Sequence, residues 1–108
     1  MAEQTPLDRR SQPRMARNKI RSIAELGEIA ARVKSEGRKV VLCHGVFDLL
    51  HMGHVRHLEE ARSHGDILIV TITADAYVNK GPGKPVFSAA LRAEMLAALS
   101  CVDFVDIV

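Results

Sequence analysis

Cysteine, long apolar runs and net charge are all scarce in this sequence. Its 108 residues include two cysteines, too few for a disulfide framework, so Cys43 and Cys101 are predicted to be buried free thiols in a reducing, cytoplasmic setting. No apolar run approaches the ~18 residues of a membrane-spanning helix, and no signal-peptide pattern opens the chain. A formal net charge of +2 is too small to indicate a nucleic-acid or membrane partner. The composition that is left, 47% hydrophobic and 26% charged, is typical of one globular domain.

Residues 1–18 differ in character from the rest of the chain. They carry two prolines and four arginines and show almost no apolar periodicity. Such a segment cannot bury enough surface to offset the entropy of ordering it. We predict a flexible basic arm over residues 1–18, solvated rather than bound to a polyanion. The globular domain is then expected over residues 19–108.

The domain is predicted to begin with a helix capped by Ser22. Ser22 and Glu25 have the spacing of a capping box, and apolar residues recur on one helical face after them. Gly37 suits the position just past the end of this helix. A buried strand is predicted over residues 39–44, and an amphipathic helix over about residues 53–65.

The second half of the domain continues the alternation of strand and helix. Residues 66–73 are nearly all apolar, which predicts a second strand covered on both faces. The connection over residues 74–87 is long, and such loops inside compact domains are usually functional. Ser88 is expected to cap a third helix, and residues 102–108 predict a third strand. The core face of the third helix is assigned to Leu91, Met95, Leu96 and Leu99.

This order of elements, strand–helix–strand–helix–strand, indicates an α/β fold. Because helical crossovers between parallel strands are right-handed, we predict a right-handed parallel sheet with helices on both faces. Ligands bind to such sheets at the carboxyl ends of the strands. The functional site is therefore expected where the strand over residues 39–44 leads into the next helix.

The stretch at that point reads GVFDLLHMGH, residues 45–54. Gly45 and Gly53 allow the backbone to turn sharply or to approach a ligand closely. The amides of a helix that starts near Gly53 would offer unpaired donors and the positive end of a dipole to an anion. His51 and His54 flank this helix start, and either can be protonated near neutral pH. The stretch therefore predicts a phosphate site with two titratable donors.

The pattern G-x-F-D-x-x-H-x-G-H resembles the signature of the cytidylyltransferase-like nucleotidyltransferases. The longer run GVFDLLHMGHVRHLEEAR, residues 45–62, is most similar to heptose 1-phosphate adenylyltransferases, with glycerol-3-phosphate cytidylyltransferases next. This resemblance implies a Rossmann-like fold that joins a nucleoside triphosphate, ATP or CTP, to a sugar phosphate or polyol phosphate and releases pyrophosphate. It also implies Mg²⁺ carried by the triphosphate. The choice between ATP and CTP stays open.

The resemblance covers about residues 20–108. Members of the family continue for two further strands, in the sheet order 3-2-1-4-5, and carry a serine- and threonine-rich motif that nothing in this sequence matches. We therefore expect the front portion of a nucleotidyltransferase domain, truncated after its third strand. A second function is left open beside the first: a non-catalytic fragment that keeps only phosphate or nucleotide binding or strand pairing. A homodimer is also left open.

The candidate site residues fall into two groups, and Lys80 and Arg92 among them resemble the family's lysine-and-arginine pair. The predicted catalytic residues are His51, His54 and Lys80. The residues assigned to binding of nucleotide or substrate are Gly45, Val46, Phe47, Asp48, Gly53, Lys84 and Arg92. A lysine suits the bridging of two phosphates as a mobile point charge, whereas an arginine can clamp one phosphate bidentately. Phe47 is expected to pack beneath the loop in preference to stacking on a base.

Several of these residues also have a purely structural interpretation. Asp48 either stabilises a turn through the backbone amides of its own loop or touches substrate or metal-bound water. Lys80, Lys84 and Arg92 are alternatively solvated surface charges. His57 lies one helical turn further on, but a trio of histidines lacks the cysteines or the fourth ligand of a structural zinc site. No metal site formed by the protein is therefore predicted.

Overall fold

Three parallel strands form the centre of the structure, a computed structural model that describes residues 15–78 and 81–108. β1 (Val40–Gly45), β2 (Ile67–Ile72) and β3 (Phe104–Ile107) lie side by side in that order. A helix follows β1 and another precedes β3, so each crossover between neighbouring parallel strands is helical. This arrangement confirms the predicted α/β sheet, and it places the carboxyl ends of the strands at one end of the molecule.

One face of the sheet is covered by α2 (Ile23–Ser35). The predicted capping box is present: the Glu25 amide donates to Ser22 Oγ at 3.2 Å, and the Ser22 amide donates to Glu25 Oε1 at 2.9 Å. Gly37 follows the helix with a φ of 76°, which a residue with a side chain rarely adopts. Both predicted ends of this helix are confirmed. The buried residues shared by α2 and the sheet are Leu26, Val33, Ile67 and Ile69.

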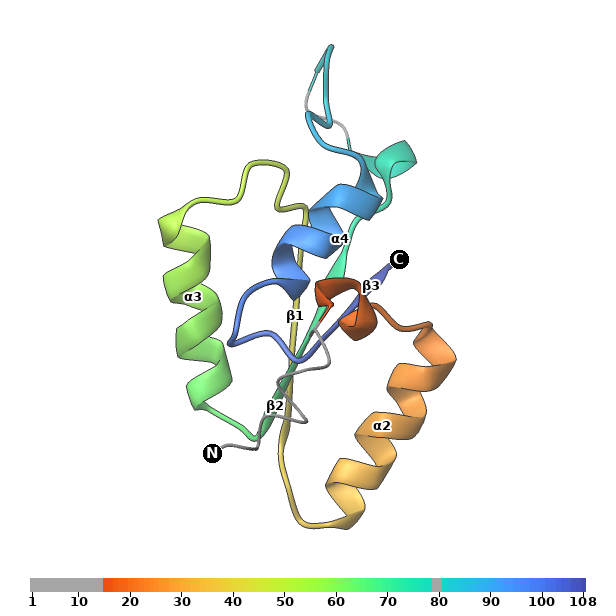
Figure 1. Cartoon of the computed structure of the whole chain (residues 1–108), viewed down its shortest axis with the longest axis vertical. Helices are drawn as coiled ribbons and strands as arrows, with labels where there is room; N and C mark the ends of the chain where they lie inside the picture. The colour runs from red at the N-terminus through yellow and green to blue at the C-terminus, as the bar shows by residue number, and fades with distance from the viewer. Residues whose placement is uncertain (1–14, 79–80) are drawn as a thin grey trace, which may run out of the picture.

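The opposite face is covered by α3 (Met52–Ser63) and α4 (Ala89–Ala97), so the sheet has helices on both faces, as predicted. Figure 1 shows α3 and α2 on opposite sides of the strands. The main buried cluster on this side includes Leu58 of α3, Leu96 of α4, and Leu68, Val70 and Ile72 of β2. None of the helices in the described ranges is long and apolar enough to cross a membrane.

The core face of α4 differs from the predicted one. Ser88 caps the helix as expected, accepting a hydrogen bond from the Leu91 amide at 3.3 Å. Leu91, assigned to the core, is nevertheless 52% exposed. The buried residues of the helix are Ala89, Arg92, Ala93, Leu96 and Ala97. The prediction is confirmed for Leu96, and Leu99 packs against the main buried cluster. It left out the alanines, which bring the helix close to the sheet, because it followed the large apolar side chains.

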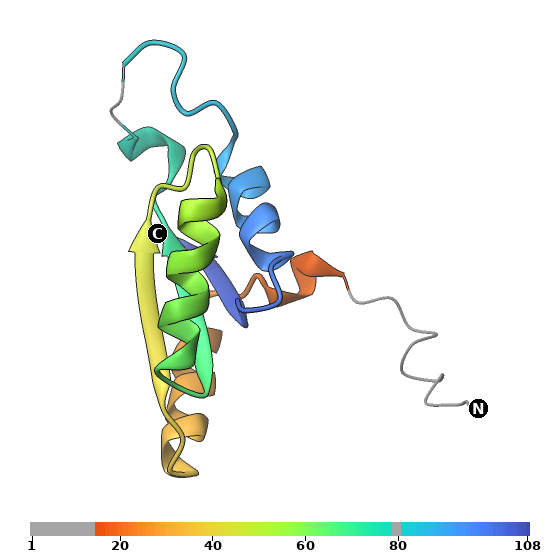
Figure 2. The ribbon, with the colours of Figure 1, turned by 90° about the vertical axis from the view of Figure 1, so that its left-hand side faces the viewer.

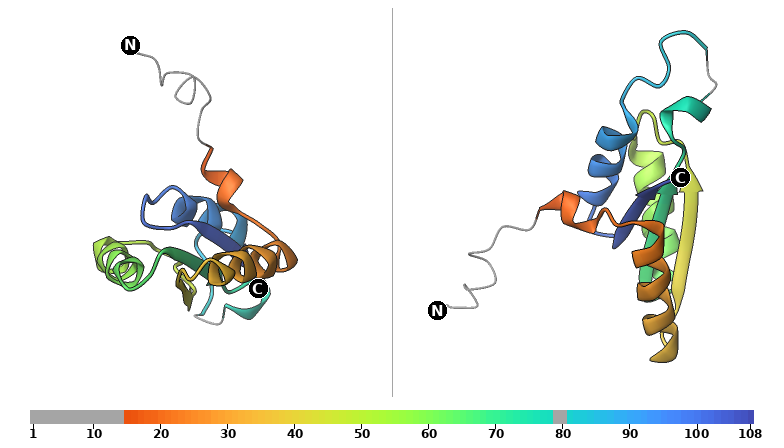
Figure 3. Two further views of the ribbon diagram at one scale, coloured as in Figure 1. Left: turned by 90° about the horizontal axis from the view of Figure 1, so that it is seen from below. Right: turned by 90° about the vertical axis from the view of Figure 1, so that its right-hand side faces the viewer.

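The first described residues pack on the body of the fold. Figure 3 shows η1 (Ala16–Lys19), a short 3-10 helix, lying beside α4. Lys19 Nζ donates to the carbonyl oxygens of Leu99 at 3.2 Å and Val102 at 2.8 Å, and Ile20 forms a parallel bridge with Val105. Residues 15–18, which we assigned to the arm, therefore lie next to residues that are held against the body of the fold. The rest of the predicted arm lies outside the described residues.

β1 forms one edge of the sheet, visible at the left of Figure 2. It pairs with β2 from Val40 opposite Ile67 to Gly45 opposite Ile72, and within the part of the chain that the structure describes its other side pairs with no strand. Leu42, in the middle of β1, is 66% exposed. An edge with unpaired backbone groups and an exposed apolar side chain is a template for another strand.

Candidate functional site

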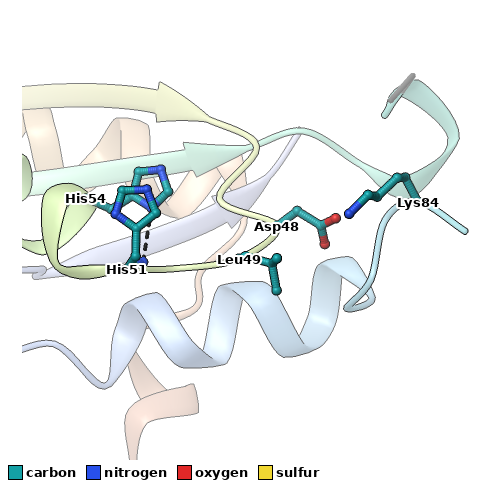
Figure 4. Close-up of a pocket in the computed structure, with 5 residues that line it drawn as sticks. All are labelled: Asp48, Leu49, His51, His54 and Lys84. Carbon is teal, nitrogen blue, oxygen red and sulfur yellow. Dashed lines mark hydrogen bonds between the residues drawn. The ribbon is translucent and has the colours of Figure 1, made fainter. Parts of the chain in front are cut away.

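The predicted site lies where β1 ends and α3 begins. A cavity of about 320 Å³ opens there, within the range of small-ligand sites. Its lining residues, drawn in Figure 4, are Asp48, Leu49, His51, His54 and Lys84. All but Leu49 were predicted as functional residues, so the fold brings much of the predicted site together. The loop and the helix start supply every lining residue except Lys84, which comes from the connection that precedes α4.

The two histidines form the N-terminal cap of α3. His51 is the residue before the helix, and its Nδ1 accepts a hydrogen bond from the Gly53 amide at 3.0 Å. His54 Nδ1 in turn accepts from the His51 amide at 3.2 Å. The rings are stacked, with centroids 3.9 Å apart and planes 28° from parallel. Each Nδ1 acts as an acceptor, so the proton of a neutral ring is assigned to Nε2 in both residues.

Gly53 makes room for this arrangement. A Cβ atom at position 53 would lie 2.8 Å from Cε1 and 3.0 Å from Nδ1 of His51. Atoms do not pack that closely, so a side chain here would push the His51 ring out of its capping position. We had predicted that Gly53 lets the backbone turn sharply or approach a ligand closely. The structure shows a nearer reason, which is the space occupied by the neighbouring imidazole.

Phe47 packs beneath the loop, the arrangement that sequence reasoning preferred. Its ring contacts the main core cluster and meets the His54 ring edge-on, with centroids 5.4 Å apart. A Cβ at Gly45 would lie 2.7 Å from Phe47 Cε2, so Gly45 is required by this ring. The φ of Phe47 is 52°, an uncommon left-handed value for a residue with a bulky side chain.

Asp48 joins two loops. Its side chain is buried, and its two oxygens accept hydrogen bonds from the amides of Val86 at 2.8 Å and Phe87 at 3.0 Å. Burial raises the pKa of Asp48, but the two amide bonds and the charges of Lys84 and Arg92 outweigh it, so the pKa is lowered. Asp48 is therefore ionised at neutral pH. The amides that it holds belong to the connection before α4 and not, as one alternative had it, to its own loop.

This attachment brings Lys84 to the cavity. The connection that carries Lys84 protrudes at the top of Figure 1 and returns to the body at Val86 and Phe87, where Asp48 holds it. In Figure 4 the Lys84 side chain extends toward the carboxylate of Asp48. The ammonium therefore lies at the rim of the histidine cavity. Lys80, the other predicted lysine, lies outside the described residues, so its role stays a prediction.

Arg92 does not lie where the predictions placed it. Its side chain is fully buried, so it is neither a surface charge nor exposed to a phosphate. The guanidinium donates three hydrogen bonds: Nε to Phe87 O at 3.0 Å, Nη1 to Val46 O at 2.8 Å, and Nη2 to Asp75 Oδ1 at 2.6 Å. Arg92 thus joins three segments around the site from inside. This corrects the prediction of a phosphate clamp.

Asp75 and the Val46 carbonyl are partners that sequence reasoning missed. Asp75 begins η2 (Asp75–Tyr77), three residues after the last residue of β2, at the end of the parallel sheet where ligands bind. An acidic residue at that end of a strand is the feature of the sequence that could have identified Asp75 as part of the site. Val46 was predicted to contribute backbone to a substrate wall, and its carbonyl oxygen instead accepts from Arg92.

The other histidines lie apart from the cavity. His44, at the end of β1, bonds Thr71 Oγ1 through Nδ1 at 2.8 Å and Thr73 Oγ1 through Nε2 at 3.3 Å. His57 is exposed on α3. Across residues 15–78 and 81–108, no three histidine, cysteine or acidic side chains are grouped so that they could hold a metal ion. Of the described residues, Asp48 alone brings a carboxylate to the cavity lining, and its two oxygens accept amide hydrogens.

The profile of one known protein family matches this region. The family is described as cytidylyltransferase-like, and the match extends over residues 42–106, from β1 into β3. It includes the whole loop and helix start that form the cavity.

Known proteins resemble the chain over most of its length. The bifunctional protein HldE of Geotalea uraniireducens is 46% identical over 91 residues, and that of Sulfurimonas denitrificans is 49% identical over 88 residues. These alignments cover 82% and 80% of this chain but 19% and 18% of the two relatives. The chain thus spans about a fifth of the length of the curated relatives it matches.

A solved structure supports the fold. The lipopolysaccharide core biosynthesis protein of Thermoplasma volcanium superposes with a TM-score of 0.62 and 32% sequence identity. The superposition covers 67% of this chain and 59% of that protein.

Proposed function

The chain belongs to the cytidylyltransferase-like family, and from this premise we propose that it forms part of a nucleotidyltransferase domain. The proposed reaction joins a nucleoside triphosphate, ATP or CTP, to a sugar phosphate or polyol phosphate and releases pyrophosphate. The observation that carries the proposal is the pair of linked histidines, His51 and His54, in a cavity shared with Lys84. The name of the solved relative, a lipopolysaccharide core biosynthesis protein, favours a sugar phosphate as acceptor.

The reaction requires two anions to meet in line. An oxygen of the acceptor phosphate attacks the α-phosphorus of the triphosphate and forms a new P–O bond. The bond from that phosphorus to the bridging oxygen breaks, and pyrophosphate leaves with the electron pair. Negative charge grows on the bridging and non-bridging oxygens. The protein therefore has to position the two reactants and stabilise that charge, and it needs no nucleophile of its own.

The histidines suit this task as neutral hydrogen-bond donors. A proton on Nδ1 of either ring would remove the acceptor that caps α3, so the observed arrangement favours the neutral ring with its proton on Nε2. The sequence had left both charge states open, because either ring can be protonated near neutral pH. Each Nε2–H can donate to a phosphate oxygen, and the donor is held in place before the substrate binds. Positive charge comes from Lys84 at the cavity rim, and a contribution from Lys80, which lies outside the described residues, stays a prediction.

We propose that Mg²⁺ enters this site with the triphosphate. Its chemical contribution when bound is to neutralise part of the phosphate charge. The described residues fit this role because Asp48, the one carboxylate lining the cavity, already accepts two amide bonds. The phosphate oxygens themselves would then provide most of the coordination.

A second function from another class is binding without chemistry. The loop that forms the cavity follows β1 in the chain, and no strand among the described residues pairs with the outer edge of β1. A cavity with no further strand beside β1 favours a chain that binds phosphate or nucleotide without turning it over. Pairing of this edge with another strand is part of the same alternative.

The test compares the wild-type chain with His51→Ala and His54→Ala. Pyrophosphate release is followed with ATP and CTP against a panel of sugar and polyol phosphates. Each substitution should lower turnover by about 10²-fold or more, as the loss of one electrostatic donor does. His57→Ala, on the exposed side of the same helix, is the matched control and should keep wild-type turnover.

Calorimetric titration of the same proteins with pyrophosphate, ATP and CTP separates the two functions. Binding without pyrophosphate release in the wild type would favour the non-catalytic alternative. Turnover that is unchanged in both histidine variants would remove these residues from the mechanism. If the folded wild-type chain shows neither binding nor turnover, both proposals are contradicted.

A further inference from the structure

The backbone of the loop is unusual at Phe47. Its φ of 52° places a bulky residue in the left-handed region, where residues other than glycine persist only when the surrounding structure holds them. Such residues cluster at functional sites. The backbone conformation of Phe47 also sets the direction of its ring, which lies edge-on to the imidazole of His54 inside the site.

The residues on both sides of Phe47 are held by the start of α4. Before it, Val46 O accepts a hydrogen bond from Arg92 Nη1 at 2.8 Å. After it, the Asp48 carboxylate accepts from two amides of the connection, one of them that of Phe87. Phe87 O accepts from Arg92 Nε at 3.0 Å, so one short segment is shared by both attachments. The left-handed turn is therefore fixed at each end.

Asp75 fixes the orientation of the arginine. Arg92 Nη2 donates to Asp75 Oδ1 at 2.6 Å, and a guanidinium is a planar fork whose donors have fixed relative directions. Once Asp75 and Phe87 O hold two of its nitrogens, the third can point only toward Val46. The Asp75 side chain is 48% exposed, whereas Arg92 is fully buried. The carboxylate thus also compensates a charge that is removed from water.

We propose that Asp75 and Arg92 are positioning residues of the nucleotidyltransfer site, an inference that rests on the proposed function. They hold the left-handed turn at Phe47, and the Phe47 ring then supports His54 in its stacked, capping position. Neither residue lines the cavity. Both act on the reaction through the geometry of the histidine pair, and the cavity is formed before any ligand binds.

Two substitutions break this chain of contacts without removing a large side chain. Arg92→Lys keeps the charge, but a single ammonium cannot reach three acceptors arranged around a fork. Asp75→Asn keeps an oxygen acceptor and removes the charge at a half-exposed position. Because a misplacement of about 1 Å costs about 10²-fold in rate, Arg92→Lys should lower kcat by about 10- to 100-fold. KM for the phosphorylated substrates should stay within about threefold, since Lys84 and the helix amides are unchanged.

Arg62→Lys is the matched control. Arg62 is also partly buried and also bonds a carboxylate and a carbonyl, through Nε to Asp103 Oδ2 at 3.1 Å and through Nη1 to Gly65 O at 2.8 Å. It lies at the far end of α3, away from the cavity. A merely structural role predicts that the two arginine variants lose similar stability and keep similar turnover.

The experiment measures melting temperature, kcat and KM, together with the imidazole ¹⁵N resonances of the full 108-residue chain. We expect Arg92→Lys and Asp75→Asn to lower kcat and to shift the His54 Nδ1 resonance, while Arg62→Lys does neither. Wild-type kcat with unchanged His54 resonances in folded Asp75→Asn would overturn the inference. If Arg92→Lys does not fold, Asp75→Asn decides alone.

The imidazole resonances also distinguish this inference from the proposed function. If the wild type turns over no substrate, the proposed function fails, and the positioning role is decided by whether His54 Nδ1 shifts in Asp75→Asn. If the wild type is active and no His54 shift accompanies the substitution, the positioning role fails and the proposed function stands.

Discussion

Gly53→Ala should separate the activity of the site from the stability of the fold. The added Cβ would lie 2.8 Å from His51 Cε1 and 3.0 Å from Nδ1. To regain an ordinary contact the ring has to move by at least half an ångström. That movement carries His51 away from the Gly53 amide that it caps, and it also carries Nε2 away from the position where it would meet a phosphate.

The two effects on stability nearly cancel. Alanine in place of glycine within a helix raises the free energy of unfolding by up to about 1 kcal/mol. Loss of a capping bond costs about 1 kcal/mol. The free energy of unfolding should therefore change little. Turnover should fall by about 10- to 100-fold, because a displacement approaching 1 Å of a group that acts only in the transition state lowers kcat strongly.

Gly27→Ala provides the control for this experiment. Gly27 lies in α2, and a Cβ there would meet nothing within 4 Å. Its melting temperature should rise by about 4 °C, the shift that about 1 kcal/mol gives in a domain of this size, and its turnover should equal that of the wild type. Thermal unfolding and pyrophosphate release are measured on the same samples. Wild-type turnover in Gly53→Ala would refute the idea that this contact sets the position of His51.

Three further predictions concern the charges of the site and the edge of the sheet. Burial raises the pKa of Asp48, but the amide bonds and the neighbouring cations lower it by more, so the pKa in the folded state is lowered. The ionised carboxylate therefore stabilises the fold above the unfolded pKa of about 3.9. This stabilisation is lost as the pH falls through the lower pKa of the folded state. Asp48→Asn should lower the melting temperature at pH 7 and reduce its loss between pH 7 and pH 3; an unchanged pH profile would contradict this. Lys84→Ala and Lys80→Ala should each weaken the binding of pyrophosphate measured by calorimetry, and added salt should weaken binding to the wild type in the same way. Wild-type affinity in both variants would show that the two lysines are solvated loop residues. If the isolated chain associates through β1, Leu42→Lys should return it to monomers in sedimentation experiments, whereas association abolished only by Leu91→Lys would place the contact on α4.

The sequence was sufficient for the features that local geometry decides. Ser22 and Ser88 cap helices because an oxygen before a helix can reach an amide three residues later. The alternation of strand and helix predicted the parallel sheet and placed residues 45–54 at the carboxyl end of β1. Sequence reasoning was less successful on α4, where the size of Leu91 was a poorer guide to burial than the position of the alanines.

The sequence by itself determined that two histidines meet at one helix start, because their spacing of three residues places them on the same turn. The tertiary structure decided their tautomer, since the acceptor role of Nδ1 depends on where each ring lies. It also decided what Asp48 and Arg92 do. Asp48 bonds amides 38 and 39 residues away, and Arg92 bonds a carbonyl 46 residues away. Such partners become neighbours only when the crossover helices pack on the sheet, and no local spacing in the sequence encodes that distance.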